Sequence, residues 1–477
     1  MFAVVIVLVL PSLYRSGMAQ AALYNGDEAI YAEMAREMVR SGRPSELSFD
    51  GEVLFPRPPG AVWALAAAYR VHGLDPIEPP LRAMNAFLAA LAVALTLIFG
   101  AILCSPLVGL VGAGLLAFSD LFLGYARVYE SEPLLLCCVL LALSGWALRS
   151  RAGWLLFGVG LGGALLTKQL VGLLPLIGPI GDRAIAILKR RDEEDVPPRA
   201  PGLGLGLGLA FLVAAPWHVL MIARHGAAFL DAYFVRSLLG RASGALLHRT
   251  SWTFYGQELL RSEGPFYAPL FLVAALAILF IGITRRRTAE LVLGAWALGV
   301  IVIFSCSRSR YDYYLLLAYP AFALATAQLL AALPRLRSLV GAALVVLSSA
   351  LHLPRNLTAQ RGDDETRALL ASTHALAPGA LLYCFARHPY TARIYGDRQV
   401  RIFVETERDL RGARAVRETG MPAPAELAQP ASRALELAAR PSLMIVPRAR
   451  VDVLRDVAPD RYRVLGESET LRLLYLP

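Results

Sequence analysis

Long apolar runs separated by short polar connections fill roughly the first 350 residues of the chain. Most of these runs approach the ~20 residues that a helix needs to cross a bilayer, and they carry few charges. The pattern predicts a polytopic α-helical membrane region over residues 1–352, with about eleven transmembrane helices and a range of eleven to thirteen. The runs lie at residues 1–13, 82–103, 105–124, 133–149, 153–168, 169–187, 203–221, 266–284, 288–306, 312–332 and 336–352.

Two shorter helical patterns lie in the first outer loop, which spans residues 14–81. The run 60–72 is apolar but too short for a span, so we expect an amphipathic helix in the membrane interface. Counting it as a span would also invert every later connection. Residues 27–41 predict a second interfacial helix, with acidic residues at its start and basic residues near its end. This charge order suits the helix dipole.

The character of the chain changes after about residue 352. The long apolar runs stop, and charged residues and prolines become frequent. Strand patterns with helical patterns between them predict a small soluble α/β domain over residues 353–477. The expected strands are 379–385, 399–404, 442–446 and 472–476, and the expected helices are 364–376 and 424–439.

Composition and charge agree with a membrane protein and suggest its orientation. Charged residues make up 18% of the 477 residues, below the roughly 25% of soluble domains, which argues against a soluble enzyme and against disorder. The net charge of +10 would suggest nucleic acid in a soluble protein, but basic cytoplasmic connections explain it here, and we expect no nucleic-acid partner. With eleven spans and the amino terminus inside, the basic clusters near 149–151, 189–191, 285–287 and 335–337 all face the cytoplasm. The domain 353–477 then lies outside.

The outer connections of this topology carry a particular set of charges. Carboxylates come from the first two loops, whereas cations come mainly from later ones. Lys168 stands at the junction of two apolar runs with only Gln169 as polar company, and an unpaired ammonium at membrane depth is costly. A solvated loop charge explains most of the other residues equally well when each is taken alone. The set is Asp27, Glu28, Arg57, Arg127, Glu130, Glu132, Lys168, Arg224, Arg236, Arg241, His248, Arg249, Arg308, Arg310 and Tyr311.

Carboxylates and cations on one rim of the membrane suit a particular chemistry. A carboxylate can deprotonate an acceptor hydroxyl or hold a divalent cation. Arginine and lysine can hold phosphate oxygens and stabilise the charge that develops on a leaving phosphate. With apolar spans to hold a lipid tail, these residues predict the transfer of a group from a lipid-linked phosphate to an acceptor.

Several motifs, in their order along the chain, resemble the GT-C glycosyltransferases. The resemblance is to the group that contains the undecaprenyl-phosphate aminoarabinose transferase and the protein O-mannosyltransferases, and it covers about residues 20–330. It implies a GT-C fold and a polyprenyl-phosphate sugar donor. The motifs are Gly26–Glu33 followed by Phe55–Pro59, Ala126-Arg127 followed by Glu132, Leu166-Thr167-Lys168, and Ser305–Arg310 followed by Tyr314 and Tyr319-Pro320.

The resemblance also implies roles for individual residues. Asp27 would be the leading catalytic carboxylate, which activates or orients the acceptor with support from Glu28, and Glu132 would match the second acidic position. Asp27 and Glu132 would also be the ligands of Mg²⁺ or Mn²⁺ if the reaction needs a divalent cation, which the sequence leaves open. The implied contacts to the donor phosphate are Arg57, Lys168 and Arg310, and the candidate substrate contacts are Tyr31, Arg127, Arg236, Arg241, His248 and Tyr314.

Three positions depart from the aminoarabinose branch. Ile30 stands where these relatives commonly have arginine, and Pro56 stands where they have an acid. Both departures argue against that particular sugar and against a metal near Pro56. At the second acidic position, Glu132 replaces the more usual aspartate and lengthens the arm by one methylene group. The sugar and the acceptor therefore stay open.

These observations predict an inverting membrane glycosyltransferase. It would move a sugar from a polyprenyl-phosphate donor to a hydroxyl of a lipid, a glycan or a protein, on the outer face of a bacterial inner membrane. One alternative is a transporter or flippase for a lipid-linked saccharide, although no inverted repeat with interrupted helices is visible. Another is a membrane scaffold that displays the domain 353–477, which would leave the outer acids and Lys168 without a purpose.

Overall fold

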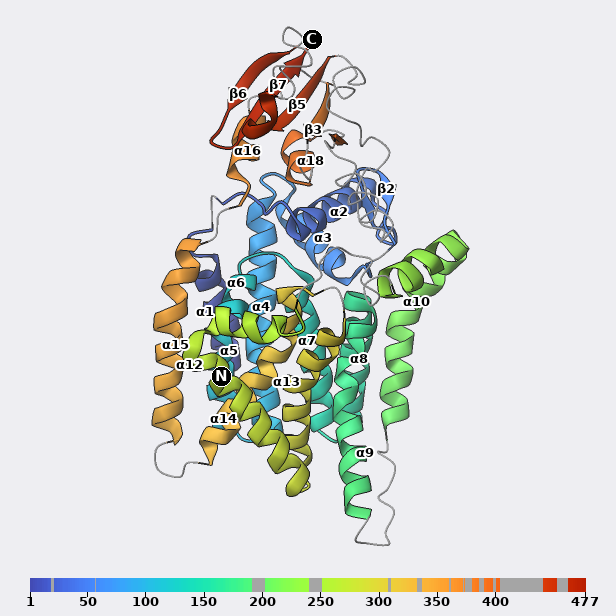
Figure 1. Cartoon of the computed structure of the whole chain (residues 1–477). Helices are drawn as coiled ribbons and strands as arrows, with labels where there is room; N and C mark the ends of the chain where they lie inside the picture. The colour runs from blue at the N-terminus through green and yellow to red at the C-terminus, as the bar shows by residue number, and fades with distance from the viewer. Residues whose placement is uncertain are drawn as a thin grey trace.

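The computed structural model shows a helical bundle with a small sheet domain at one end (Figure 1). Two helices, α2 and α3, lie between the bundle and the sheet. The structure describes residues 1–18, 21–55, 57–190, 202–239, 251–307, 310–332, 337–359, 362–371, 373, 380–385, 390–397, 400–403, 441–452 and 462–477.

The bundle is built from long apolar helices that match the predicted runs. Among the described residues, seven helices are long and apolar enough to cross a membrane, and α1, α5 and α7 are shorter apolar helices. A polytopic membrane protein is thereby confirmed, whereas the number of spans stays a prediction. The helices are α1 (Phe2–Arg15), α4 (Glu78–Leu103), α5 (Pro106–Ala117), α6 (Asp120–Tyr125), α7 (Ser131–Ala147), α8 (Arg151–Lys168), α9 (Ile177–Arg190), α10 (Leu203–Leu230), α12 (Phe254–Thr284), α13 (Thr288–Cys306), α14 (Tyr319–Ala331) and α15 (Arg337–Ala359).

The chain reverses at the end of α8, as the position of Lys168 predicts. Gln169 has a φ of 36°, and the 3₁₀ helix η1 (Gln169–Leu176) then packs back against α8. Arg149, which precedes α8, forms an ion pair with Asp182, which follows η1 in α9. Lys168 therefore lies at the tip of a helical hairpin.

The expected outer loop over residues 222–265 is largely helical instead. Helix α10 continues to Leu230 and is followed by the π-helix η2 (Asp231–Leu239), while α12 begins already at Phe254. Gly226 and Gly264 interrupt these helices with φ values of 52° and 75°, which glycine adopts at little cost. These two glycines allow a helix to change direction where a polar stretch follows an apolar run.

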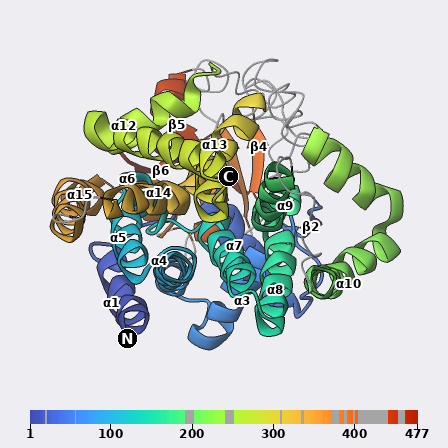
Figure 2. The ribbon, with the colours of Figure 1, turned by 90° about the horizontal axis from the view of Figure 1, so that it is seen from below.

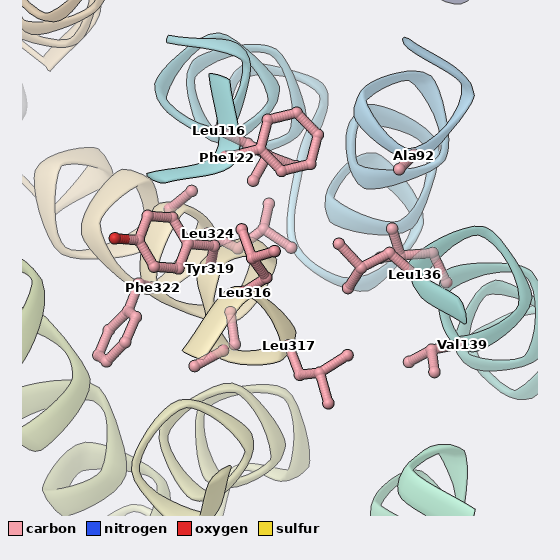
Figure 3. Close-up of a cluster of buried hydrophobic side chains, with 14 of the residues drawn as sticks. Ala92, Leu116, Phe122, Leu136, Val139, Leu316, Leu317, Tyr319, Phe322 and Leu324 are labelled. Carbon is pink, nitrogen blue, oxygen red and sulfur yellow. The ribbon is translucent and has the colours of Figure 1, made fainter. Parts of the chain in front are cut away.

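The core of the bundle surrounds α14 and the 3₁₀ helix η3 (Asp312–Ala318) that precedes it. The span from Asp312 to Ala331 is 78% buried, the largest share among the seven long helices. Figure 3 shows side chains of η3 and α14, among them Leu316 and Tyr319, meeting Phe122, Leu136 and Ala92 of the neighbouring helices. Seen from below, α14 lies between α12 and α5 (Figure 2). This rigid centre supports the connections at the end of the bundle nearest the sheet.

Helices α2 (Asp27–Ser41) and α3 (Gly60–His72) have the predicted bounds. They pack against each other, and α3 also contacts α4 (Figure 1). The short antiparallel strands β1 (Ser48–Phe49) and β2 (Glu52–Val53) connect them.

The carboxyl-terminal part contains a five-stranded sheet in the order β4-β3-β5-β7-β6. Strand β3 is parallel to β4 and β5, whereas β7 is antiparallel to β5 and β6. Strand β6 and helix α18 were not predicted from the sequence, and the expected helix 424–439 lies outside the described residues. Helix α15 continues past residue 352 to Ala359, and the domain boundary at 352 stays a prediction. The elements are α16 (Asp364–Ala371), β3 (Leu381–Phe385), α18 (Tyr390–Gly396), β4 (Val400–Phe403), β5 (Ser442–Pro447), the 3₁₀ turn η5 (Arg448–Arg450), β6 (Arg463–Glu467) and β7 (Leu471–Leu476).

Candidate active site

Helix α2 presents Asp27 at its first turn. The residue follows Gly26, the N-cap, so its carboxylate lies at the positive end of the helix dipole. Asp27 Oδ1 accepts a hydrogen bond from Arg57 Nη2 at 2.7 Å. The guanidinium of Arg57 also lies over the ring of Tyr31, 4.8 Å from its centroid. Two predicted site residues from the first outer loop, Asp27 and Arg57, are therefore in direct contact.

Lys168 meets a carboxylate at the tip of its hairpin. Its ammonium forms an ion pair with Glu132, whose side chain is fully buried at the start of α7. The Nζ atom also lies 4.8 Å from the ring centroids of both Tyr313 and Tyr314. The ion pair with Glu132 offsets the desolvation cost that we expected for the Lys168 ammonium, because a buried charge is tolerated when it is paired.

A single pocket of about 400 Å³ joins these groups. The first loop, the start of α7 and the α8 hairpin all contribute to its wall, although they are far apart in sequence. One predicted catalytic residue, Asp27, and two predicted phosphate contacts, Arg57 and Lys168, thus line one cavity, whereas Glu28, Glu132 and Arg310 are not part of its lining. Its lining is Asp27, Tyr31, Arg57, Pro58, Glu130, Ser131, Thr167, Lys168, Gln169 and Tyr313.

Glu130 is a pocket residue to which the sequence analysis gave no role. Its exposed fraction is 7%, and burial raises the pKa of its carboxyl group well above the usual range. The neighbouring carboxylates of Asp27 and Glu132 raise this pKa further, whereas Arg57 and Lys168 oppose the shift. The signal in the sequence was a second acid two positions before Glu132, which looked like an ordinary loop charge.

Glu28 holds the loop before α2 rather than lining the pocket beside Lys168. Its carboxylate pairs with the buried Arg82 of α4 and accepts backbone hydrogen bonds from Tyr24 at 2.7 Å and Tyr129 at 2.9 Å. Burial raises the pKa of Glu28, although Arg82 counteracts the shift. This ion pair connects α2 to α4 and to the connection before α7, and so fixes the position of Asp27 one residue earlier.

The carboxyl-terminal part also contacts the segment that leads into Asp27. The hydroxyl of Tyr395 accepts a hydrogen bond from the Leu23 amide at 2.7 Å, and Asn25 Oδ1 accepts one from the Thr391 amide at 3.2 Å. Further along α2, Arg393 lies 3.2 Å from the fully buried carboxylate of Glu33. Helix α18 therefore helps to hold α2 in place.

The other described candidate residues are not part of the lining of this pocket. Arg310 donates a hydrogen bond to the Ser305 carbonyl at 2.7 Å, and Arg127 donates to the carbonyls of Tyr14 and Ser16 at 2.8 Å each. Arg236 pairs with Asp231, half-exposed, and Tyr314 stacks on Phe304 while approaching Lys168. Their proposed roles toward substrate stay predictions, and Arg241 and His248 lie outside the described residues.

An apolar groove of about 1090 Å³ begins beside the pocket. Its walls are α8, η1 and α10, and Gln169 lines both the groove and the pocket. Leucines such as Leu165 and Leu173 dominate the lining, together with Phe211 of α10. The charged pocket is thus directly adjacent to an extended apolar surface.

The carboxylates of the pocket do not fit a resident metal ion. Asp27 and Glu132, the ligands expected if a cation were needed, already neutralise Arg57 and Lys168. In the described part of the chain, no group of three or more His, Cys, Asp or Glu side chains is arranged to hold an ion. We therefore derive no chemical step through a metal.

Comparison with known protein sequences agrees with this geometry. Residues 1–222 match the dolichyl-phosphate-mannose-protein mannosyltransferase family. An uncharacterised protein of Aquifex aeolicus is 26% identical over 67% of this chain and 62% of its own length. The undecaprenyl phosphate-alpha-4-amino-4-deoxy-L-arabinose arabinosyl transferase of Pseudomonas aeruginosa is 26% identical over 64% of this chain and 55% of its own length. The chain thus spans only somewhat more than half the length of these curated relatives.

Solved structures extend the likeness to nearly the whole chain. ArnT from Cupriavidus metallidurans, bound to undecaprenyl phosphate, has a TM-score of 0.76 at 16% identity and covers 99% of this chain and 98% of ArnT. This is a GT-C-fold protein similar to the aminoarabinose and mannosyl transferases. The oligosaccharyltransferase AglB from Archaeoglobus fulgidus, in complex with an inhibitory peptide and a dolichol-phosphate, has a TM-score of 0.62 at 10% identity, over 94% of this chain and 70% of AglB. The predicted fold class and family resemblance are confirmed.

Proposed function

We propose that this chain is a membrane glycosyltransferase that uses a polyprenyl-phosphate sugar as donor. The observation that carries the proposal is the adjacency of an apolar groove and a charged pocket that contains the cations Arg57 and Lys168, joined at Gln169. A lipid phosphate needs both surfaces, one for its charge and one for its tail. The likeness to ArnT and to the mannosyltransferase family supports the same reading.

The donor would bind with its phosphate beside Arg57 and Lys168 and its isoprenoid tail in the groove of α8 and α10. Arginine has five N–H donors in a planar fork, so Arg57 can contact phosphate oxygens while it still pairs with Asp27. The ammonium of Lys168 has three donors and can likewise serve both Glu132 and a phosphate. Burial strengthens both contacts, because the local dielectric constant is low.

Transfer would proceed by a single displacement. The oxygen of an acceptor hydroxyl forms a bond to the anomeric carbon, while the bond between that carbon and the phosphate oxygen breaks. The lipid phosphate leaves with the electron pair, and Arg57 and Lys168 stabilise its additional negative charge. The hydroxyl proton passes to Asp27, and the anomeric configuration inverts.

We place the reaction on the outer face of a bacterial inner membrane. Helix α2, which contributes Asp27 to the pocket, lies at the sheet end of the bundle, whereas α9 ends and α12 meets α13 at the opposite end (Figure 1). The connections at that opposite end carry the basic residues Lys189 and Arg285–Arg287, which favour the cytoplasm.

Undecaprenyl phosphate binding by paired variants tests the donor site. Lys168→Ala leaves Glu132 buried without its cation, which destabilises the protein by about 3–5 kcal/mol. A loss of undecaprenyl phosphate binding could then come from unfolding rather than from the lost contact. The double variant Lys168→Met with Glu132→Gln removes both charges at similar volume and restores most of that stability. We expect the double variant to be as thermally stable as wild type but to bind undecaprenyl phosphate about tenfold more weakly or worse.

Unchanged affinity in a folded double variant would remove Lys168 from the phosphate site. The matched control is Arg149→Met with Asp182→Asn, an ion pair at the far end of the α8 hairpin. The control should leave the affinity for undecaprenyl phosphate within about twofold of wild type, because it lies beyond the Coulombic reach of the phosphate.

A further inference from the structure

A second cavity begins on the other side of Asp27. It encloses about 1050 Å³, a volume that includes space open to solvent. The cavity lies between the start of α2, helix α6, the first turns of α12 and the start of η3. Asp27 and Glu130 line both this cavity and the phosphate pocket, so they form a wall between the two spaces.

Carboxylates outnumber cations in the lining of this second cavity, whereas the donor pocket is lined by two carboxylates, Asp27 and Glu130, and two cations, Arg57 and Lys168. Arg261 is the only basic side chain that lines its described wall, and both oxygens of the Glu258 carboxylate already hold its guanidinium. Asp27 and Glu28 are already paired with Arg57 and Arg82. The like charge that a phosphate or carboxylate ligand would meet here therefore comes from Asp120 and Asp312. The acidic lining residues are Asp27, Glu28, Asp120, Glu130 and Asp312.

One of these acids, Glu130, is evidence that the cavity binds a ligand. Asp120 accepts a hydrogen bond from Asn356 at 2.8 Å, and Asp312 accepts one from the hydroxyl of Tyr125 at 3.0 Å. In contrast, no described residue donates a hydrogen bond or an ion pair to the carboxyl group of Glu130, although its exposed fraction is only 7%. A buried polar group without a partner is costly, and a ligand in the cavity would supply that partner.

The remaining polar lining suits a polyhydroxyl ligand. Carboxylates accept hydrogen bonds from hydroxyl groups, and the amides of Asn25 and Asn356 both donate and accept them. Tyr24 and Tyr125 add flat apolar faces at the edges of the cavity. A saccharide presents many hydroxyl groups around a small apolar ring, which matches this combination, whereas a phosphorylated lipid matches none of its charges.

We propose that this cavity binds the acceptor and that the acceptor is a glycan without phosphate or carboxylate groups at its accepting end. The inference rests on the proposed glycosyl transfer. Asp27 then stands between donor and acceptor, where its carboxylate can take the proton of the attacking hydroxyl. Glu130 is hydrogen-bonded to the acceptor across the same wall.

An assay with native fractions tests the identity of the acceptor. Purified full-length protein in nanodiscs is incubated with the polyprenyl-linked sugars extracted from the source cells. The acceptors are three fractions of the same cells, containing uncharged glycans, phosphorylated lipids and proteins. Free undecaprenyl phosphate reports transfer or hydrolysis of the donor, and mass spectrometry identifies the fraction that gains a sugar. We expect the gain on uncharged glycans.

Each other outcome contradicts a specific claim. Sugar on phosphorylated lipids, sugar on serine or threonine, or release of undecaprenyl phosphate without any gain would overturn the glycan acceptor while leaving donor cleavage intact. No release of undecaprenyl phosphate with any fraction would contradict the proposed function itself.

A variant pair tests the cavity by a second route. Asp120→Asn with Asp312→Asn keeps an oxygen to accept from Asn356 and Tyr125, so the fold is preserved. We expect the KM for the acceptor fraction to rise about tenfold, with undecaprenyl phosphate affinity within about twofold of wild type. Glu467→Gln, a half-exposed acid of β6 that pairs with Arg448, is the matched control and should change neither value. An unchanged acceptor KM in the double variant would overturn the assignment of this cavity.

Discussion

At the scale of single residues, the site depends on how each buried charge is neutralised. Asp27 pairs with Arg57, Glu28 with Arg82, and Glu132 with Lys168. Each of these carboxylates has a dedicated cation, as buried ions require. Glu130 lies among them with no such cation within the described residues, and burial raises its pKa well above the usual range. Its protonation state therefore sets the net charge of the phosphate pocket.

The pH dependence of donor binding should report the titration of the Glu130 carboxyl group. As the pH rises through its raised pKa, Glu130 gains a negative charge beside the phosphate and weakens binding. The variant Glu130→Gln stays neutral at every pH. We expect the dissociation constant of undecaprenyl phosphate for wild type to rise by about tenfold relative to that for Glu130→Gln as the pH rises through this raised pKa. The comparison cancels the titration of the phosphate itself, and parallel curves for the two proteins would contradict the role.

The same group predicts a change in stability with a definite sign. The unfolded chain releases the Glu130 proton near the ordinary pKa of glutamate, whereas the folded protein keeps it to higher pH. The folded state thus binds more protons in this interval, so wild type loses stability as the pH rises through it. Thermal unfolding of Glu130→Gln should lack this loss.

The sequence could predict the residues whose charge was conspicuous against an apolar background. Asp27 at a helix start and Lys168 between two apolar runs are of this kind, and both line the pocket. Ion-pair partners were not visible, because Arg82 begins an apolar run and its contact with Glu28 crosses 54 residues of sequence. Arg310 looked equivalent to Lys168 by charge alone, but its local hydrogen bond to Ser305 directs it elsewhere.

At the scale of elements, glycine decides where two long helices change direction. Gly264 in α12 has φ 75° and ψ −179°, a conformation that is open to glycine but strained for residues with a Cβ atom. The bend turns the first part of α12, with Glu258 and Arg261, toward the second cavity. No atom lies within 4 Å of a Cβ built on Gly264, so steric contact is not the reason for glycine here.

Two glycine-to-alanine variants in the same helix separate backbone strain from packing. Gly256 also has open space around a built Cβ, but it has ordinary helical geometry. We expect Gly264→Ala to lower the unfolding free energy by about 1–3 kcal/mol. Gly256→Ala should be neutral or raise it by up to about 1 kcal/mol. Equal melting temperatures for the two purified variants would contradict the claim that the backbone conformation at Gly264 requires glycine.

Element boundaries were predictable where hydrophobic periodicity and polar flanks coincided. The bounds of α2 and α3 match their predictions, because acids occupy the first turn of α2 and basic residues occupy the last turn of α3. The region 222–265 was misread as loop, because polar residues at a membrane surface look like loop residues although they can continue a helix. Strand β6 was missed because its exposed pattern lacks a buried face, with Arg463 and Glu467 at its ends.

At the scale of the whole molecule, the account requires that the pocket, the second cavity and the sheet share one side of the membrane. Cysteines introduced by Glu52→Cys, in exposed β2, and Arg285→Cys, between α12 and α13, test this in a Cys306→Ser background. A membrane-impermeant maleimide applied to spheroplasts should label the cysteine at 52, and the cysteine at 285 only after lysis. The reverse pattern would place the site in the cytoplasm.

The fold class followed from composition and periodicity, whereas the site required the three-dimensional arrangement. Connections separated by more than a hundred residues meet beside Asp27, as when the Tyr129 amide donates to the Glu28 carboxylate, 101 residues earlier, at 2.9 Å. Sequence order could suggest that these connections share one face. It could not show that cations and carboxylates together line the space on one side of Asp27, whereas carboxylates predominate on the other side.

Sugar transfer by Asp27→Asn tests the central claim most directly. The amide keeps the size of Asp27 and its hydrogen bond from Arg57 but cannot take a proton at neutral pH. With extracted lipid-linked sugars and cell acceptors, we expect transfer to fall by a factor of about 10²–10⁴, while undecaprenyl phosphate still binds. Full transfer by this variant, in protein that elutes as a folded species, would contradict the account.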